Sequence, residues 1–127
     1  MFSSIKTSEA NKSKITELTH KFNLGAENII ARLAFTYSIS QERKMKLKDI
    51  KDSKGKEYSK NILFGKYFNY YIALLSQHYN IYKADPNISK YVKMHIDDGI
   101  ELLYNSYSKH QNYTSTDFLI DILEKQI

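Results

Sequence analysis

One aromatic-rich stretch, NILFGKYFNYYIALLSQHYN from Asn61 to Asn80, most strongly limits what this chain can fold into. It holds six Tyr or Phe residues and a His. Its large side chains recur at intervals of three and four residues, at Phe64, Tyr67, Phe68, Tyr71, Ile72, Leu75, His78 and Tyr79. This spacing aligns them along one side of an α-helix. The sequence therefore predicts a single helix over about 62–80 with an apolar stripe.

The same rings could instead form an exposed platform on which nucleobases stack. A stacking platform needs exposed rings, whereas a periodic stripe is typical of a buried helix face. We therefore interpret the stretch as part of the core. His78, at the edge of the stripe, is interpreted as a hydrogen-bonded core residue rather than a catalyst.

The composition indicates one globular domain, residues 1–127, large enough to bury a hydrophobic core. The chain contains no apolar run long enough for a transmembrane helix. Its first residues, MFSSIKTSEANK, lack the apolar centre of a signal peptide. The absence of Cys excludes disulfides, thiolate metal sites and a Cys nucleophile. We expect a cytoplasmic protein.

Positive charge is concentrated in the first half of the chain. Residues 1–66 carry 14 Lys or Arg against 7 Asp or Glu, whereas residues 67–127 carry 5 against 7. The steepest excess runs from Arg43 to Lys66, with 9 basic and 3 acidic residues. Such asymmetry favours contact between the first half and a polyanion such as nucleic acid. The alternative is a solvated, Lys-rich loop.

The first forty residues predict a strand, a helix, a turn and a second helix. Residues 2–7 read as extended chain, and Ser8 reads as the N-cap of the first helix, with Glu9 in its first turn. Asn23-Leu24-Gly25 ends that helix, and a second one begins near Ala26. This is the order of a ribbon–helix–helix unit, in which two chains pair their N-terminal strands. The sequence thus predicts a mainly α fold with a ribbon–helix–helix-like start.

The remaining chain is predicted to be a polar connection followed by helices. Residues 41–60 form the connection, with a turn at 52–55, and residues 61–127 form a helical half. Asp85-Pro86-Asn87 begins the next helix, whose inward face carries Ile88, Tyr91, Val92, His95, Ile96, Gly99 and Leu103. Gly inside a helix costs about 1 kcal/mol relative to Ala, so we expect another backbone to approach Gly99 closely. Thr114-Ser115-Thr116 caps a last helix with Phe118, Leu119, Ile122 and Leu123.

No catalytic set is apparent. His95, Asp97 and Asp98 suggest metal ligation at first, but Asp97 projects about 200° away from His95 on a helix. We interpret the two Asp residues as solvated acids on an outer face. There is no phosphate-binding Gly-rich loop, no metalloprotease motif and no nucleophile elbow. We expect no enzymatic activity, no cofactor and no metal.

Binding to DNA is the remaining chemistry that the residues suggest. The candidate contacts to the phosphate backbone are Lys6, Lys12, Lys14, Lys21, Gly25, Arg43, Lys44 and Lys46. Lys12 is expected to point to solvent, and the amides of the turn at Leu24-Gly25-Ala26 could receive a phosphate. The alternative is that the helix 1 lysines only solubilise that helix. Arg32 on the second helix could also hold the DNA backbone, or could instead anchor a subunit contact or pair with an internal carboxylate.

The chain resembles the DndE family of bacterial DNA phosphorothioation, a restriction–modification type of system. The resemblance rests on four stretches in the same order: Leu24 with Asn28-Ile29-Ile30-Ala31-Arg32-Leu33-Ala34; Asn61-Ile62-Leu63-Phe64-Gly65-Lys66-Tyr67 with Tyr71-Ile72-Ala73-Leu74-Leu75; His95-Ile96-Asp97-Asp98-Gly99-Ile100-Glu101-Leu102-Leu103; and the closing Asp117-Phe118-Leu119 helix. Together they touch most of the chain.

The resemblance implies a non-catalytic DNA-binding subunit that works with other phosphorothioation (Dnd) proteins. Members act beside partners that replace a non-bridging phosphate oxygen of DNA with sulfur. The resemblance also implies binding to duplex DNA, particularly nicked duplex, and a homotetramer. The turn Phe22-Asn23-Leu24-Gly25-Ala26-Glu27-Asn28 departs from the family by lacking its Pro and by one extra residue. The alternatives are a ribbon–helix–helix repressor or antitoxin, a pure assembly adaptor, and an enzyme such as a nuclease.

Overall fold

The computed structural model describes residues 2–107 and 115–126 and is mainly helical. In chain order its elements are β1 Ser4–Lys6, the 3-10 turn η1 Glu9–Asn11, α1 Lys12–Lys21, α2 Glu27–Ser40, η2 Leu47–Asp49, β2 Glu57–Ser59, α3 Lys60–Leu63, η3 Gly65–Tyr67, α4 Phe68–Tyr79, α5 Ile88–Tyr107 and α6 Ser115–Gln126. The predicted mainly α fold with a short strand at its start is confirmed. In the part of the chain described, no helix is long and apolar enough to cross a lipid bilayer.

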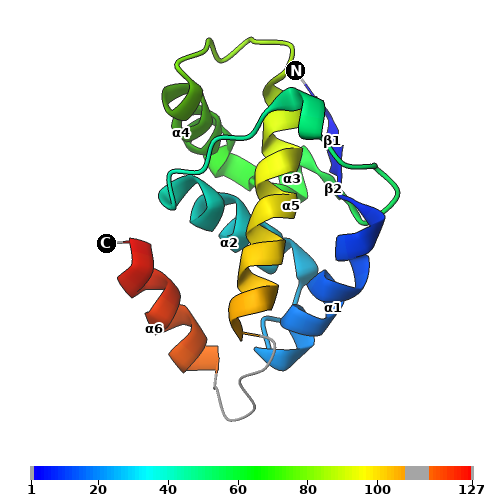
Figure 1. The fold of residues 1–127 in the computed structure, drawn as a ribbon, viewed down its shortest axis with the longest axis vertical. Helices are drawn as coiled ribbons and strands as arrows, with labels where there is room; N and C mark the ends of the chain where they lie inside the picture. Colours follow the sequence, from blue (N-terminus) through cyan, green and yellow to red (C-terminus); the bar gives the residue numbers. More distant parts are fainter. Residues whose placement is uncertain (1, 108–114, 127) are drawn as a thin grey trace.

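Helix α5 is the central element of the fold. Figure 1 shows it running the length of the molecule, with α2 crossing behind it and the 41–56 connection passing in front. Its packing against α2 is more extensive than that between any other two elements. Because α5 is covered on both sides, its polar residues Lys93, His95 and Asp97 are buried together with Val92 and Ile96.

The crossing of α5 over α2 depends on Gly99. A Cβ atom at this position would lie 1.9 Å from the carbonyl oxygen of Ala34, so no larger residue fits without moving α2. Ala34 is itself completely buried. The close backbone approach predicted at Gly99 is therefore confirmed.

The N-terminal strand pairs within its own chain. β1 and β2 are antiparallel, with Ser4 opposite Ser59, Ile5 opposite Tyr58 and Lys6 opposite Glu57. Ile5 and Tyr58 share the buried face. The ribbon of this chain thus takes its second strand from residues that the sequence assigned to a polar connection.

The aromatic stretch does not form the single helix predicted over 62–80. Gly65, the first residue of η3, adopts a φ of +56°, and this turn of the backbone interrupts the helix between α3 and α4. Phe64, Ile72 and Leu75 are buried as predicted, but Tyr67 is 51% exposed because the break at Gly65 rotates it outward. The interpretation as core is therefore right for most of the stripe and wrong for Tyr67.

The predicted ends of the other helices are close to those observed. Asn23 and Gly25, both at positive φ, separate α1 from α2, and the Asp85-Pro86-Asn87 segment precedes α5. On α6, Phe118 and Ile122 are buried, whereas Leu119 and Leu123 are exposed. The Phe118 ring stacks on Phe22 with a centroid distance of 4.0 Å. The predicted capping residue Thr114 lies outside the described residues.

Candidate nucleic-acid interface

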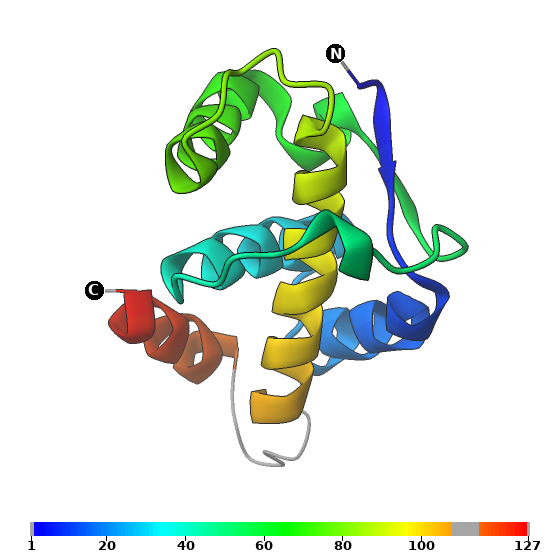
Figure 2. The same ribbon diagram turned by 45° about the horizontal axis from the view of Figure 1, so that its top comes forward.

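The strongest concentration of positive charge lies on the connection that crosses α5. Residues 43–56 carry seven Lys or Arg and two Asp. Figure 2 shows this segment passing over α5 toward the β1–β2 pair. Two buried polar clusters attach it to the helices beneath.

The first cluster is centred on Asp98 of α5. Its Oδ2 accepts a hydrogen bond from Ser38 Oγ at 2.6 Å and another from Arg43 Nε at 2.7 Å. The Asp98 side chain is 13% exposed. The carboxylate therefore joins the end of α2 to the beginning of the connection.

A chain of hydrogen bonds continues from Ser38 through His95 to Tyr79. Ser38 Oγ lies 2.8 Å from His95 Nδ1, and Tyr79 Oη lies 2.6 Å from His95 Nε2. Because Ser38 gives its proton to Asp98, His95 Nδ1 must be the donor to Ser38. Nε2 then accepts from Tyr79, whose oxygen accepts from the backbone N–H of Met45 at 2.8 Å. This chain of hydrogen bonds, in which every donor has one acceptor, attaches the 41–56 connection to α4, α5 and α2.

This Ser–His–Asp cluster is not arranged for nucleophilic catalysis. Ser38 and His95 are completely buried, and the Ser38 proton is already donated to a carboxylate rather than to the imidazole. Burial, aided by nearby His78, lowers the pKa of His95 to about 4, so the ring is neutral near pH 7. The cluster therefore has a positioning role.

The second cluster is centred on Asp97, which is only 3% exposed. Its carboxylate pairs with Lys93 Nζ at 2.8 Å and accepts from Asn11 Nδ2 at 2.8 Å and from the Ser8 N–H at 3.0 Å. Lys93 also donates to the backbone oxygen of Asp52. The prediction that Asp97 and Asp98 are solvated acids on an outer face is wrong, because the N-terminal segment and the connection cover the second side of α5.

The turn over residues 52–55 docks tightly against η1. Asp52 Oδ2 accepts from the backbone N–H groups of Glu9 and Lys54 at 3.0 and 3.1 Å. A Cβ atom at Gly55 would lie 2.1 Å from the carbonyl oxygen of Ser8. Ser8 precedes η1 as predicted, but its side chain makes no capping hydrogen bond. The predicted turn is therefore also the place where the connection packs closely against the backbone of Ser8.

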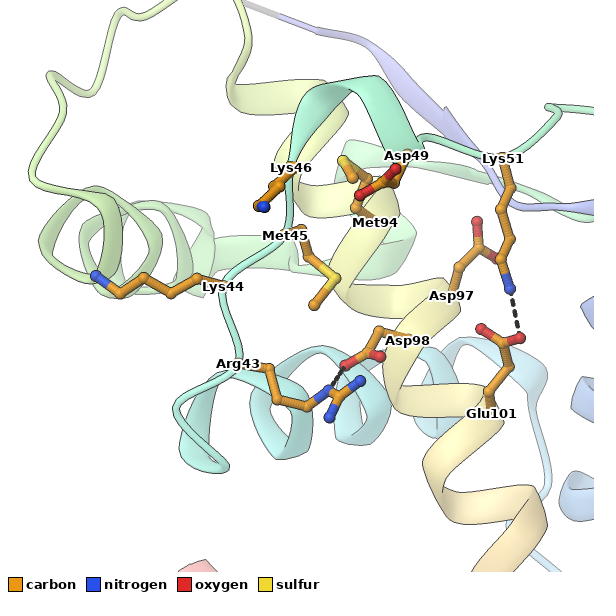
Figure 3. Close-up of a pocket in the computed structure, with 10 residues that line it drawn as sticks. All are labelled: Arg43, Lys44, Met45, Lys46, Asp49, Lys51, Met94, Asp97, Asp98 and Glu101. Carbon is orange, nitrogen blue, oxygen red and sulfur yellow. Dashed lines mark hydrogen bonds and ion pairs between the residues drawn. The ribbon is translucent and has the colours of Figure 1, made fainter.

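A hollow of about 300 Å³ lies between the connection and α5. Figure 3 shows the Arg43–Asp98 and Lys51–Glu101 ion pairs at its edge, with Met45 and Met94 on its apolar wall. Both basic and acidic side chains line it, with Asp97, Asp98 and Glu101 contributed by α5. In the described residues, no group of three His, Asp or Glu side chains could hold a metal ion.

The predicted contacts on the connection divide into two kinds. Arg43 is paired with Asp98, and Lys44 Nζ donates to the backbone oxygen of His78 at 2.8 Å. Lys46 is exposed and has no ion pair with any described acid. Lys48 and Lys54 share this property. Neither is among the contacts predicted from the sequence, although both lie in the Lys-rich run.

The predicted contacts near α1 form a separate group. Lys12 is exposed, as expected, whereas Lys6 lies 3.8 Å from Glu57. Lys14 and Lys21 are half-buried, and their ammonium groups lie 5.4 Å and 5.9 Å from the ring centroids of Tyr104 and Phe22. The cavities lined by Lys12 and by Gly25 share no residue with the hollow beside Arg43. The structure does not bring the two groups into one cluster.

The N-terminus of α2, which follows Gly25, already carries an acid. Glu27, in the first turn of α2, accepts from Thr16 at 2.7 Å and pairs with Lys56 at 3.1 Å. Burial raises the pKa of Glu27, but the hydrogen bonds from Thr16 and Lys56 outweigh it and the net shift is downward. The ionised carboxylate makes this turn less suited to a phosphate than predicted.

Arg32 lies in a groove between α2 and α4 rather than beside an internal carboxylate. Its Nε is buried without a hydrogen-bond partner, and none of the described acids forms an ion pair with it. The groove is lined by Ile29, Arg32, Leu33, Thr36 and Tyr71. The predicted alternative in which Arg32 pairs with an internal carboxylate is therefore not observed among the described residues.

Comparison with known proteins agrees with the resemblance in the sequence. The model of the family described as DNA sulphur modification protein DndE matches residues 4–111. This range ends before α6, so the resemblance of the Asp117-Phe118-Leu119 helix is not part of the match. A search of curated proteins finds no match.

A solved structure shares the fold. The crystal structure of DndE from Escherichia coli B7A, described as involved in DNA phosphorothioation modification, superposes with a TM-score of 0.64 at 21% identity. The similarity covers 81% of this chain and 98% of that one. Since the family match covers most of the sequence, the chain belongs to the DndE family of DNA sulphur modification proteins.

Proposed function

We propose that this protein is a non-catalytic, DNA-binding subunit of a DNA phosphorothioation complex. The observation that supports this most directly is the Lys-rich connection fixed across α5. Its Lys46, Lys48 and Lys54 side chains are exposed and unpaired among the described residues. Arg43, Lys51 and Lys56 use ion pairs to position the segment.

The expected contacts are to phosphates rather than to bases. Lysine ammonium groups neutralise phosphates and carry no sequence information by themselves. Lys12 on α1 is proposed as a separate contact outside the connection, and Lys6, Lys14 and Lys21 are proposed as weaker contributors because each already faces an acid or a ring. Gly25 is the least favoured contact, since Glu27 lies beside it.

Family membership supports the remaining parts of the proposal. Sulfur transfer would belong to other Dnd proteins, which is consistent with the buried Ser38–His95–Asp98 cluster. A homotetramer would present four copies of the basic connection to one duplex, and avidity would strengthen binding. A nick makes the duplex easier to bend, so a surface that touches only the backbone can follow it at lower cost.

The decisive experiment is a salt titration with a triple variant. Lys46→Gln, Lys48→Gln and Lys54→Gln would be combined, and fluorescence anisotropy would measure the Kd for intact and nicked duplexes of the same sequence. Each lost phosphate contact should reduce the slope of log K against log salt by about 0.9. The combined variant should therefore lose up to about 3 units of slope.

The control carries the same loss of charge elsewhere. Lys66→Gln, Lys83→Gln and Lys90→Gln change exposed lysines outside the connection and outside α1. If both triple variants weaken binding equally, the connection is not the DNA contact. Light scattering on the same samples would give the oligomer size, and a monomer that binds nicked duplex no better than intact duplex would contradict the tetramer and the nick preference.

The alternatives make different predictions. A ribbon–helix–helix repressor would prefer one operator, but β1 already pairs with β2 of its own chain, leaving one edge for a second chain. A pure adaptor would not bind either duplex at low salt. A competition assay with scrambled duplex separates the repressor from the proposed subunit.

A further inference from the structure

The two parts of the sequence that flank the charged connection contain no acid. All fourteen Asp and Glu residues lie outside 28–41 and 58–84. These two ranges contain α3, η3, α4 and all of α2 after its first residue, Glu27, and their charged residues are Arg32, Lys60, Lys66 and Lys83. Figures 1 and 2 both show α4 lying near α2 on one side of α5. We call this surface the α2–α4 face.

The α2–α4 face also exposes several large apolar side chains to solvent. Helix α4 contains no Asp, Glu, Lys or Arg. The exposed fractions are 60% for Ile62, 51% for Tyr67, 71% for Tyr70 and 45% for Leu74. Tyr67 at the end of η3 and Tyr70 and Leu74 of α4 follow one another at three and four residues, so they form a second, exposed stripe away from the core. Exposed stripes of this kind mark interaction surfaces.

Arg32 provides a charged anchor within this face. Its groove, of about 180 Å³, opens between α2 and α4, and the rest of its lining is Ile29, Leu33, Thr36 and Tyr71. The Nε atom is buried without an acceptor, a situation that costs about 1–3 kcal/mol if nothing supplies one. A carboxylate entering the groove would supply that acceptor.

We propose that the α2–α4 face docks an acidic, amphipathic segment of another protein. Apolar side chains of that segment would cover Tyr67, Tyr70 and Leu74, and one of its Asp or Glu side chains would pair with Arg32. Recognition of a helix in a groove uses anchors at such spacing. Lys60 and Lys66 lie over aromatic rings of this face, at its rim, where their positive charge would also favour an acidic segment.

Two other occupants fit the face less well. A two-fold contact with a second copy would place Arg32, Lys60 and Lys66 opposite the same face of the other copy, where residues 28–41 and 58–84 supply no acid to pair with them. Duplex DNA needs a series of exposed cations, whereas the cation of this groove has a buried Nε and its neighbours are apolar. The proposal extends the proposed function by naming how a partner protein attaches.

The test places a photo-reactive benzoyl-phenylalanine at Tyr70 in the full chain, expressed in its native cells. A second sample carries the same group at Asn105, an exposed position on α5. Cross-linked products would be digested and identified by mass spectrometry. The expected product at position 70 is a single segment of another protein, with Asp or Glu within one helical turn of its apolar residues.

Charge and apolar variants make the result specific. Arg32→Glu should reduce the product about tenfold or more, because it opposes the incoming carboxylate. Leu74→Asp, at an exposed position, should do the same even if Arg32→Glu affects folding. Lys90→Glu, with the same charge change elsewhere, should not. Replacing the acid of the partner by Arg should restore cross-linking to Arg32→Glu.

Several outcomes would overturn the proposal. These are a product with a second copy, a product with DNA, a product insensitive to Arg32→Glu, and no product above that from position 105. None of these readouts depends on DNA binding through the connection. A failure of the proposed DNA contact would therefore leave this experiment interpretable.

Discussion

Gly99 of α5 lies so close to Ala34 of α2 that the Cβ atom of any other residue would come within 1.9 Å of the Ala34 carbonyl oxygen. This contact fixes the crossing of the two helices that pack together most extensively. It also brings Ser38, four residues after Ala34, to His95 and Asp98, which lie four residues and one residue before Gly99 on α5.

Gly99→Ala is expected to destabilise the protein. Helix propensity alone would make it more stable by about 1 kcal/mol. Overpacking against an immobile backbone costs about 1–3 kcal/mol or more, so the net sign should be reversed. Urea unfolding followed by circular dichroism would measure the difference, with Ser106→Ala on the exposed side of α5 as control. A more stable Gly99→Ala variant would show that α5 and α2 do not cross at this distance.

Asp97→Ala is expected to cost about 3–5 kcal/mol of the free energy of unfolding, because it leaves the Lys93 ammonium buried without its partner. It also removes acceptors from Asn11 and from the Ser8 N–H. The same urea titration applies, and Asp49→Ala removes an exposed acid as control. Equal effects of the two variants would mean that Asp97 is a surface acid after all.

Tyr79→Phe is expected to loosen the connection without disturbing the core. The hydroxyl links the Met45 N–H to His95 Nε2, and its loss leaves both groups without a partner. Hydrogen exchange at the Met45 amide should become faster by about tenfold, equivalent to about 1.4 kcal/mol. Tyr91→Phe keeps the ring stacked on Tyr79 and is the matched control. Unchanged exchange in Tyr79→Phe would exclude this link between connection and helices.

The stability of the protein should fall as the pH drops from about 6.5 toward 4. Burial lowers the pKa of His95 to about 4, whereas the unfolded chain takes up the proton near 6.5. Between these values the unfolded state binds more protons, so acid favours unfolding by an amount on the order of 2–3 kcal/mol. The measurement is the urea midpoint from pH 7.5 to 4.5 for the native chain and for His95→Gln. His95→Gln should show a shallower decline, and parallel curves would contradict the assignment.

The sequence predicts those parts of the fold that depend on local pattern. The turn at Asn23-Leu24-Gly25, the start of α5 shortly after Pro86 and the close approach at Gly99 follow from the conformational limits of single residues. The β1–β2 pair does not, because Tyr58 gains its strand conformation from Ile5, far away in the chain.

The candidate site was harder to predict for a related reason. A helical projection assumes one buried face and so assigned Asp97 to solvent, but α5 has protein on both sides. The roles of Arg43 and Lys44 likewise depend on Asp98 and on the backbone of His78, which belong to other elements. Charge density indicated the segment, but only the fold separates its positioning residues from its free lysines.

The in-chain ribbon has a consequence for the order in which the protein can fold during synthesis. Ser4 finds its partner only after Ser59 has been made, and Ser8 finds Asp97 later still. The first forty residues look like an independent strand–helix–helix unit, yet they emerge from the ribosome without the surfaces that bury them. Such long-range pairing slows folding and lengthens the exposure of apolar side chains. Native structure at the N-terminus is therefore expected among the last parts to form, although it is the first to be synthesised.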